Sequence, residues 1–216
     1  MALVNDYEIV VKGLSRMFDS YTDRIEIVEL DANARVAQRV DIALYDTFGQ
    51  PQGGEPAVAE LTANPHVGRA VVYTWNLDED LVTATRAQRV GGYLSKTLTA
   101  ADLVDALERI HTGEVIVSAD PGPSAPLIGG EWPGRPEGLS VREAEVLALI
   151  VQGLTNAEIA ARTRLSPNTV KSYIRAAYQK IGVTRRAQAV GWGIAHGLRP
   201  DRVRVTGAAA RPRGNS

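Results

Sequence analysis

The apolar residues in the first half of the chain occur in short runs, and amphipathic stretches separate one run from the next. Alternation of this kind is typical of a parallel sheet that is covered by helices on both faces. We therefore expect residues 1–118 to form an α/β domain with five parallel strands. The predicted strands are Ala2 to Val4, Ile25 to Leu30, Ile42 to Tyr45, Ala70 to Tyr73 and Gly92 to Ser95.

From Leu139 to Leu198 the pattern changes to spacings of three and four, which predicts four short amphipathic helices. A Ser or Thr at a helix start accepts a hydrogen bond from a free amide of the first turn, and a Glu three residues later completes a capping box. Gly153 and Gly182 stand where the first and third helices should end, because glycine adopts the left-handed conformation easily. The expected helix starts are the boxes Ser140–Glu143 and Thr155–Glu158, the pair Ser166–Pro167, and Thr184.

The third predicted helix has one apolar face, running from Val170 to Ile181, and one polar face. A brief turn at Arg164 and Leu165 joins it to the preceding helix, Asn156 to about Thr163. Two short helices joined in this way form a helix-turn-helix, whose second helix fits the major groove of DNA. Each side chain of the polar face can donate hydrogen bonds to phosphate oxygens or base edges: these are Asn168, Lys171, Ser172, Arg175 and Gln179.

The net charge of −1 conceals an uneven distribution along the chain. Residues 1–118 carry about 10 basic and 18 acidic side chains, whereas residues 139–216 carry about 13 basic and 4 acidic ones. Residues 119–138 are rich in proline and glycine, as expected of an extended linker. The second half therefore attracts polyanions, and its basic end, residues 199–216, is expected to lack fixed structure.

Cysteine is absent, which excludes disulfides and thiolate metal sites and is consistent with a cytoplasmic location. The histidines His66, His111 and His196 are not spaced as metal ligands. No apolar run approaches the roughly 18 residues that span a bilayer. A membrane protein is therefore not expected.

Four segments of the basic half resemble the successive motifs of the LuxR-type DNA-binding domain, without a gap from about residue 139 to 198. They are LSVREAEVL (139–147), GLTNAEIA (153–160), LSPNTVK (165–171) and KIGV (180–183). The resemblance implies that the fourth helix, Arg185 to His196, pairs with its twin in a DNA-bound homodimer. It also implies that Lys171, Ser172 and Arg175 read base edges or adjacent phosphates of double-stranded DNA, while Thr155, Asn156, Thr169 and Tyr173 hold the backbone.

The alternative for this half is a helical bundle whose basic face is only a solvated surface. The charge imbalance and the aligned hydrogen-bond donors disfavour it.

In the acidic half, polar residues directly follow most of the predicted strands: Asn5 and Asp6, Asp46, Thr74 and Lys96. The carboxyl ends of parallel strands meet at one edge of a sheet, where open α/β folds bind their ligands. Two nearby carboxylates repel each other unless a cation such as Mg²⁺ or a lysine ammonium neutralises them. A carboxylate in such a site can accept a phosphoryl group.

This arrangement resembles the receiver domain of two-component response regulators, which has a flavodoxin-like fold with five strands. The resemblance implies that Asp46 is the phosphoacceptor and that Asp6, Asp46 and the carbonyl of Phe48 bind Mg²⁺. It implies that the Thr74 hydroxyl follows the phosphoryl group and that Lys96 is the counter-ion of that group. It also implies that Tyr93 is the aromatic ring that rotates on the output face. A receiver, a linker and a LuxR-type domain together are the architecture of NarL/FixJ response regulators, whose partner is a sensor histidine kinase.

Several positions depart from that family's pattern. Asn5 replaces the first acid of the pair, Trp75 replaces a small residue after Thr74, residues 47–51 displace the usual proline, and residues 32–40 leave little room for a second helix. The leading hypothesis is a dimeric response regulator whose acidic domain controls dimerisation and DNA binding. The departures supply the alternative, an orphan regulator whose receiver acts without phosphorylation as a dimerisation or ligand-sensing module.

A third hypothesis, a haloacid-type phosphatase with Asp46 as nucleophile, needs a second acid two residues later, where this chain has Phe48. An enzyme is therefore not expected. Trp132 in the linker is expected to pack on one of the two domains.

Overall fold

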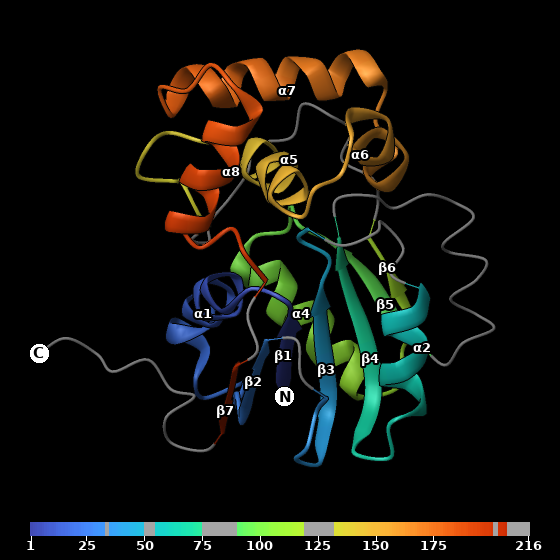
Figure 1. The fold of residues 1–216 in the computed structure, drawn as a ribbon. Coiled ribbons are helices and arrows are strands. Elements are labelled where there is room, and N and C mark those ends of the chain that lie inside the picture. The colour runs from blue at the N-terminus through green and yellow to red at the C-terminus, as the bar shows by residue number, and fades with distance from the viewer. Residues whose placement is uncertain (33–34, 50–54, 75–89, 119–131, 201–202, 207–216) are drawn as a thin grey trace, which may run out of the picture.

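A computed structural model describes residues 1–32, 35–49, 55–74, 90–118, 132–200 and 203–206. The described residues form an α/β part and a helical part, which lies over the carboxyl ends of the central strands (Figure 1). No helix within these ranges is long and apolar enough to cross a membrane.

A single sheet with strand order β6-β5-β4-β3-β1-β2-β7 forms the centre of the α/β part. Strands β1 to β6 are parallel, and the inner order β2-β1-β3-β4-β5 is that of a flavodoxin-like sheet. The expected parallel sheet is thus present, with one short extra strand at each edge. The strands are β1 (Ala2–Asn5), β2 (Glu29–Ala32), β3 (Val40–Asp46), β4 (Val67–Thr74), β5 (Val90–Ser95), β6 (Ile116–Val117) and β7 (Val203–Thr206).

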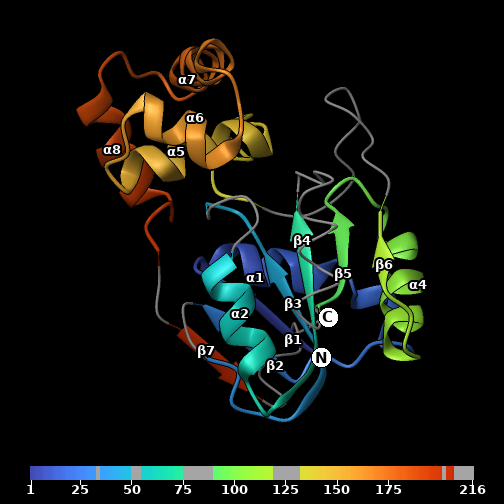
Figure 2. The same cartoon turned by 90° about the vertical axis from the view of Figure 1, so that its right-hand side faces the viewer.

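Helices cover both faces of this sheet (Figure 2). Helices α1 (Glu8–Arg16) and α4 (Ala100–His111) pack on the face that presents Leu3, while α2 (Glu55–Ala63) packs on the opposite face. A short 3-10 helix, Asp19–Tyr21, follows α1. Between β2 and β3 the described residues form no helix, as the short segment predicted.

Strand β2 begins four residues later than predicted. The apolar residues Ile25 and Ile27 do pack against the core on the α1 side, but as an irregular segment. The apolar pattern therefore predicted correctly that these residues pack on the core, but the prediction that they form part of a strand was wrong.

The strand β7 corrects the expectation that the whole basic end lacks fixed structure. It pairs antiparallel with β2, from Glu29 opposite Thr206 to Ala32 opposite Val203. Its sequence, Val-Arg-Val-Thr, has the β-branched residues and the period of two that favour a strand. The free edge of β2 offers unpaired amides and carbonyls to such a segment.

The helical part consists of α5 (Val141–Val151), α6 (Asn156–Thr163), α7 (Pro167–Lys180) and α8 (Arg186–Ala195). The predicted caps Ser140, Thr155 and Ser166 are confirmed, the first two as complete capping boxes. In the fourth helix Arg185, rather than Thr184, holds the N-cap position, and its side chain makes no cap hydrogen bond. The side-chain oxygen of Gln188 instead accepts hydrogen bonds from the amides of both residues.

Two further predictions about this part can be compared with the structure. Gly153 and Gly182 have φ angles of +90° and +69°, which confirms their left-handed conformation after α5 and α7. Trp132 packs against the helical part, and its indole nitrogen donates a hydrogen bond to the carbonyl of Leu139 at 2.8 Å. The end of the linker therefore belongs to the helical core.

Candidate nucleic-acid interface and carboxylate site

Helix α7 lies on the outside of the helical part, where it exposes one face along its length. Val170 and Ala177 are fully buried against the other helices. At the end of α7 the ammonium of Lys180 binds the carboxylate of Glu143 on α5 at 2.7 and 3.0 Å, which fixes the helix on the bundle. The predicted donors Asn168, Lys171, Ser172, Arg175 and Gln179 are exposed.

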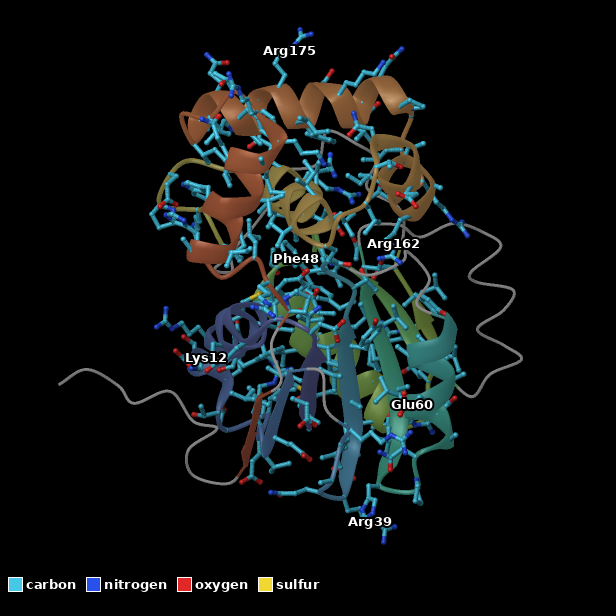
Figure 3. The ribbon with its side chains drawn as sticks, in the orientation of Figure 1. Lys12, Arg39, Phe48, Glu60, Arg162 and Arg175 are labelled. Atoms are coloured by element: carbon cyan, nitrogen blue, oxygen red, sulfur yellow. The ribbon has the colours of Figure 1, made fainter. Side chains whose placement is uncertain are left out.

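Arg175 extends from α7 away from the sheet and the other helices (Figure 3). The turn before α7 is tight because Arg164 adopts the left-handed conformation, with a φ angle of 53°. Helices α6 and α7 thus form the helix-turn-helix that the sequence predicted, and its second helix can approach a large ligand without obstruction from the α/β part.

A hollow runs beside α7 and collects several of the predicted DNA contacts. Arg186, at the start of α8, donates hydrogen bonds to the side chain of Asn156 at 3.3 Å and to the carbonyl of Leu154. It thereby holds the first turn of α6 at the hollow. The lining residues are Asn156, Lys171, Ile174, Arg175, Tyr178, Gln179, Val183 and Thr184.

Sequence reasoning had not included Tyr178, Thr184 or Arg186 among the site residues. Tyr178 lies on α7 three residues after Arg175, so helical spacing could have indicated it. Thr184 and Arg186 follow α7, and only the fold brings them to the hollow and to α6.

Two of the predicted backbone-holding residues, Thr155 and Thr169, and the predicted base-reading residue Ser172 also make hydrogen bonds within the helical part. The Thr155 hydroxyl bonds to Glu158 at 2.8 Å, and the Thr169 hydroxyl bonds to that of Ser166 at 2.7 Å. The Ser172 hydroxyl donates to the carbonyl of Asn168 at 3.0 Å. Tyr173 is half-buried. Their contacts with DNA stay predictions.

The carboxylate site lies where β3 and β5 end beneath the helical part. Lys96 donates a 2.5 Å charge-assisted hydrogen bond to Oδ1 of Asp46, and the side chains of this ion pair are only 5% and 6% exposed. The same oxygen accepts the amide of Phe48 at 2.7 Å. The rings of Phe48 and Tyr73 lie 5.9 and 5.8 Å from the ammonium. The predicted counter-ion and phosphoacceptor are therefore in direct contact.

Asn5 completes this site through its side-chain amide. Its nitrogen donates to the carbonyls of Asp46 at 2.7 Å and Phe48 at 3.2 Å, and its oxygen accepts the amide of Tyr7 at 2.9 Å. The orientation of the amide is fixed, because a carbonyl can only accept and a peptide N–H can only donate. Asn5 thus links the ends of β1 and β3.

The arrangement does not fit a bound Mg²⁺. The Lys96 ammonium and the Phe48 amide both bind Oδ1 of Asp46, and the Asn5 amide N–H points at the carbonyl of Phe48 that the resemblance assigned as a ligand. Asp6 is half-exposed, and no group of three or more Asp, Glu or His side chains within the described ranges could hold a metal ion. Cations prefer oxygen ligands whose lone pairs are free.

Thr74 and Tyr93 are both buried near this end of the sheet. The Thr74 carbonyl accepts the amide of Lys96 at 2.9 Å, while the Tyr93 ring packs within the cluster on the α2 side. A rotating role for Tyr93 and a phosphoryl contact for Thr74 stay predictions. Trp75 lies outside the described residues.

Comparison with known proteins matches the helical part to a family and relates most of the chain to response regulators. Residues 137–192 match the family described as bacterial regulatory proteins, luxR family. The response regulator proteins VraR of Staphylococcus epidermidis and Staphylococcus aureus are each 27% identical to this chain, over 90% of its length and 96% of theirs. The chain is a homologue of LuxR-type response regulators. The predicted receiver-like fold and helical LuxR-type domain are therefore confirmed.

Two solved structures are similar over most of the chain. ChrA, a response regulator of a heme-sensing two-component system, has 25% sequence identity and a TM-score of 0.42, covering 91% of this chain and 96% of its own. RcsB of Salmonella typhimurium has 20% identity and a TM-score of 0.43, covering 90% and 97%.

The receiver-like domain and the LuxR-type domain share one apolar cluster. Tyr7, Val10 and Phe48 of the receiver-like domain are buried with the residues of α5. In Figure 3, Phe48 lies at this junction, directly below the LuxR-type domain. The loop that carries Asp46 is therefore part of the contact between the domains.

Proposed function

We propose that this protein is a cytoplasmic transcription regulator that binds double-stranded DNA through helix α7. The observation that carries the proposal is the exposed row of hydrogen-bond donors on the second helix of a helix-turn-helix that matches the luxR family. Arginine and lysine on such a helix recognise phosphates and guanine edges. The surplus of basic residues in this half of the chain adds a sequence-independent attraction to the DNA backbone.

The DNA-bound form in this proposal is a homodimer that pairs through α8. Ile194 is 49% exposed on this helix, and Val190 beside it is half-buried. An apolar side chain exposed at helical spacing from another is suited to pairing with an identical helix. Two recognition helices related by twofold symmetry require half-sites about one helical turn apart.

The test of the DNA interface compares Arg175→Ala and Lys171→Ala with the control Arg39→Ala. Arg39 is exposed at the opposite end of the molecule (Figure 3). Loss of a base contact should reduce discrimination between the protein's own promoter and unrelated DNA by about 1–3 kcal/mol. Loss of a phosphate contact should instead lower the slope of log K against log salt by about 1.

Fluorescence anisotropy at several salt concentrations measures both quantities. If the two α7 variants bind like the Arg39 variant at every salt concentration, α7 is not the interface.

For the receiver-like domain, we propose control of dimerisation and DNA binding, with Asp46 as the residue that a sensor histidine kinase would phosphorylate. The acceptor oxygen would form the new P–O bond while the P–N bond of the phosphohistidine breaks. The alternative is control without phosphorylation, which the similarity to response regulators does not favour. It rests on Asn5, which replaces the first acid of the metal-binding pair and donates to the carbonyls of Asp46 and Phe48.

Incubation of the protein with acetyl phosphate or beryllofluoride in the presence of Mg²⁺ distinguishes the two candidates. Labelling that is rapid, absent in Asp46→Asn and accompanied by tighter DNA binding supports the phosphorylated form. Unlabelled protein that dimerises and binds its promoter supports the second candidate.

A further inference from the structure

We propose that Asn5, Tyr7 and Gln152 form a latch, independent of any metal ion, that joins the Asp46 loop to the LuxR-type domain. The Asp46 loop is defined as residues 46–49. The inference rests on contacts within the protein and does not depend on the proposed DNA binding.

The first part of the latch is the amide of Asn5. It donates to two backbone carbonyls of the Asp46 loop and accepts from the amide of Tyr7. A carboxylate at this position would place an oxygen against both carbonyls, because an ionised carboxylate has no proton to donate. Only an amide satisfies all three groups without a bound cation. Asn5 therefore takes the bridging place that a metal ion could otherwise occupy.

The second part is Tyr7, which the Asn5 contact places under α5. Its ring meets that of Phe48 edge to face, with centroids 5.3 Å apart and planes at 88°. A Cβ on Gly49 would lie only 2.6 Å from the ring, so this residue must be glycine for Tyr7 to fit; its φ angle of +69° also favours glycine. Burial raises the pKa of Tyr7 well above its ordinary value, so the phenol stays neutral.

The third part is Gln152, the residue that ends α5. Its side-chain nitrogen donates to the Tyr7 hydroxyl at 2.7 Å and to the carbonyl of Gly49 at 3.1 Å. Its side-chain oxygen accepts from Arg162 on α6 at 3.2 Å. One side chain thus contacts both the Asp46 loop and the first helix of the helix-turn-helix.

These contacts couple movement of the Asp46 loop to the docking of the LuxR-type domain, although the residues involved lie far apart in the sequence. A movement of the Asp46 loop that turns the carbonyl of Phe48 or Gly49 breaks the bonds to Asn5 or Gln152. The buried Tyr7 ring then loses its place between the domains. The state of the carboxylate site and the docking of the LuxR-type domain must therefore change together.

The first experiment compares the wild type with Asn5→Asp and Asn5→Ala by hydrogen-exchange mass spectrometry of the full chain, with and without Mg²⁺. In the wild type, Mg²⁺ should leave exchange in the Asp46 loop unchanged. Both variants should exchange faster in the loop and at the end of α5. Added Mg²⁺ should restore protection in Asn5→Asp, where a carboxylate can bind it, but not in Asn5→Ala. Protection of the wild-type loop by Mg²⁺ would overturn the proposal.

The second experiment uses Tyr7→Phe, which removes one hydroxyl and keeps the ring, so that folding is not at risk. We expect exchange at the end of α5 to rise about fivefold, which corresponds to about 1 kcal/mol for one net hydrogen bond. The control Tyr21→Phe removes a hydroxyl from the 3-10 helix after α1 and should change nothing there. If Tyr7→Phe also exchanges like the wild type, Tyr7 does not fasten the domains and the latch is refuted.

Discussion

Replacement of Lys96 by methionine tests how strongly the carboxylate site depends on its internal ion pair. Methionine is similar in length, so the change removes mainly the charge. The Lys96 and Asp46 side chains are almost completely buried, and removal of one partner from a buried pair costs about 3–5 kcal/mol. Asp46 keeps the hydrogen bond from the amide of Phe48, which places the expected loss near the lower end, at about 3 kcal/mol.

For a domain of this size, a loss of about 3 kcal/mol lowers the melting temperature by on the order of 10 °C. Differential scanning calorimetry of the full chain measures the shift in the transition of the receiver-like domain. Asp46→Asn should also destabilise the protein, because Lys96 then lacks its carboxylate. The double variant should be more stable than the sum of the single effects predicts, by at least about 1 kcal/mol, since neither charge is left without its partner.

Two results would refute this reasoning. One is a fall of only one or two degrees in the melting temperature of Lys96→Met, which corresponds to a loss of less than about 1 kcal/mol. The other is strict additivity of the two substitutions, which would mean that the ammonium and the carboxylate do not stabilise each other.

Three other predictions concern the LuxR-type domain. Ser140→Ala should destabilise it by about 1 kcal/mol through loss of the α5 cap, seen as a lower midpoint in urea; an unchanged midpoint would contradict the capping role. Burial pushes the pKa of Glu143 up, but hydrogen bonds from Lys180 and Ser140 outweigh it and hold the pKa below the ordinary value of 4.5. The stability from Glu143 should thus be complete above about pH 4.5 and disappear as the pH falls through its lowered folded pKa, a dependence that Glu143→Gln should flatten in urea titrations. A fragment beginning at Trp132 should melt at a higher temperature than one beginning at Leu139, because the indole packs on the helical core; equal melting by circular dichroism would count against that packing.

The features that the sequence predicted well are those that depend on near neighbours. Ser140, Thr155 and Ser166 cap helices by bonds to residues three positions away, so their pattern is visible in the sequence itself. The parallel sheet was predictable for the same reason, since each strand has its own apolar run. Ile25 and Ile27 show the limit, because an apolar pair reports burial and not backbone conformation.

The candidate sites were predictable only in part. Asp46 and Lys96 could be placed at one sheet edge from the strand pattern, and the structure joins them directly. The bonds from Asn5 to the carbonyls of Asp46 and Phe48 join residues 41 and 43 positions apart, and those from Gln152 to Gly49 and Tyr7 join residues 103 and 145 positions apart, so they could not be foreseen. Asn5 was interpreted only as a missing acid. Asn5 acts as a hydrogen-bond donor because the fold brings the carbonyls of Asp46 and Phe48 to its side chain.

Strand β7 gives the two domains a second covalent connection. Leu198 is buried in the LuxR-type domain and Val203 is already paired with β2, and the chain between them can span at most about 17 Å. While that strand stays paired, the LuxR-type domain is held to the sheet at both of its ends and not only by the chain that leads from β6 to Trp132. Its remaining motion is a rotation about the line that joins the two connections. Any larger separation must first peel the strand from the sheet and leave the edge of β2 open to another strand, including the same segment of a second molecule.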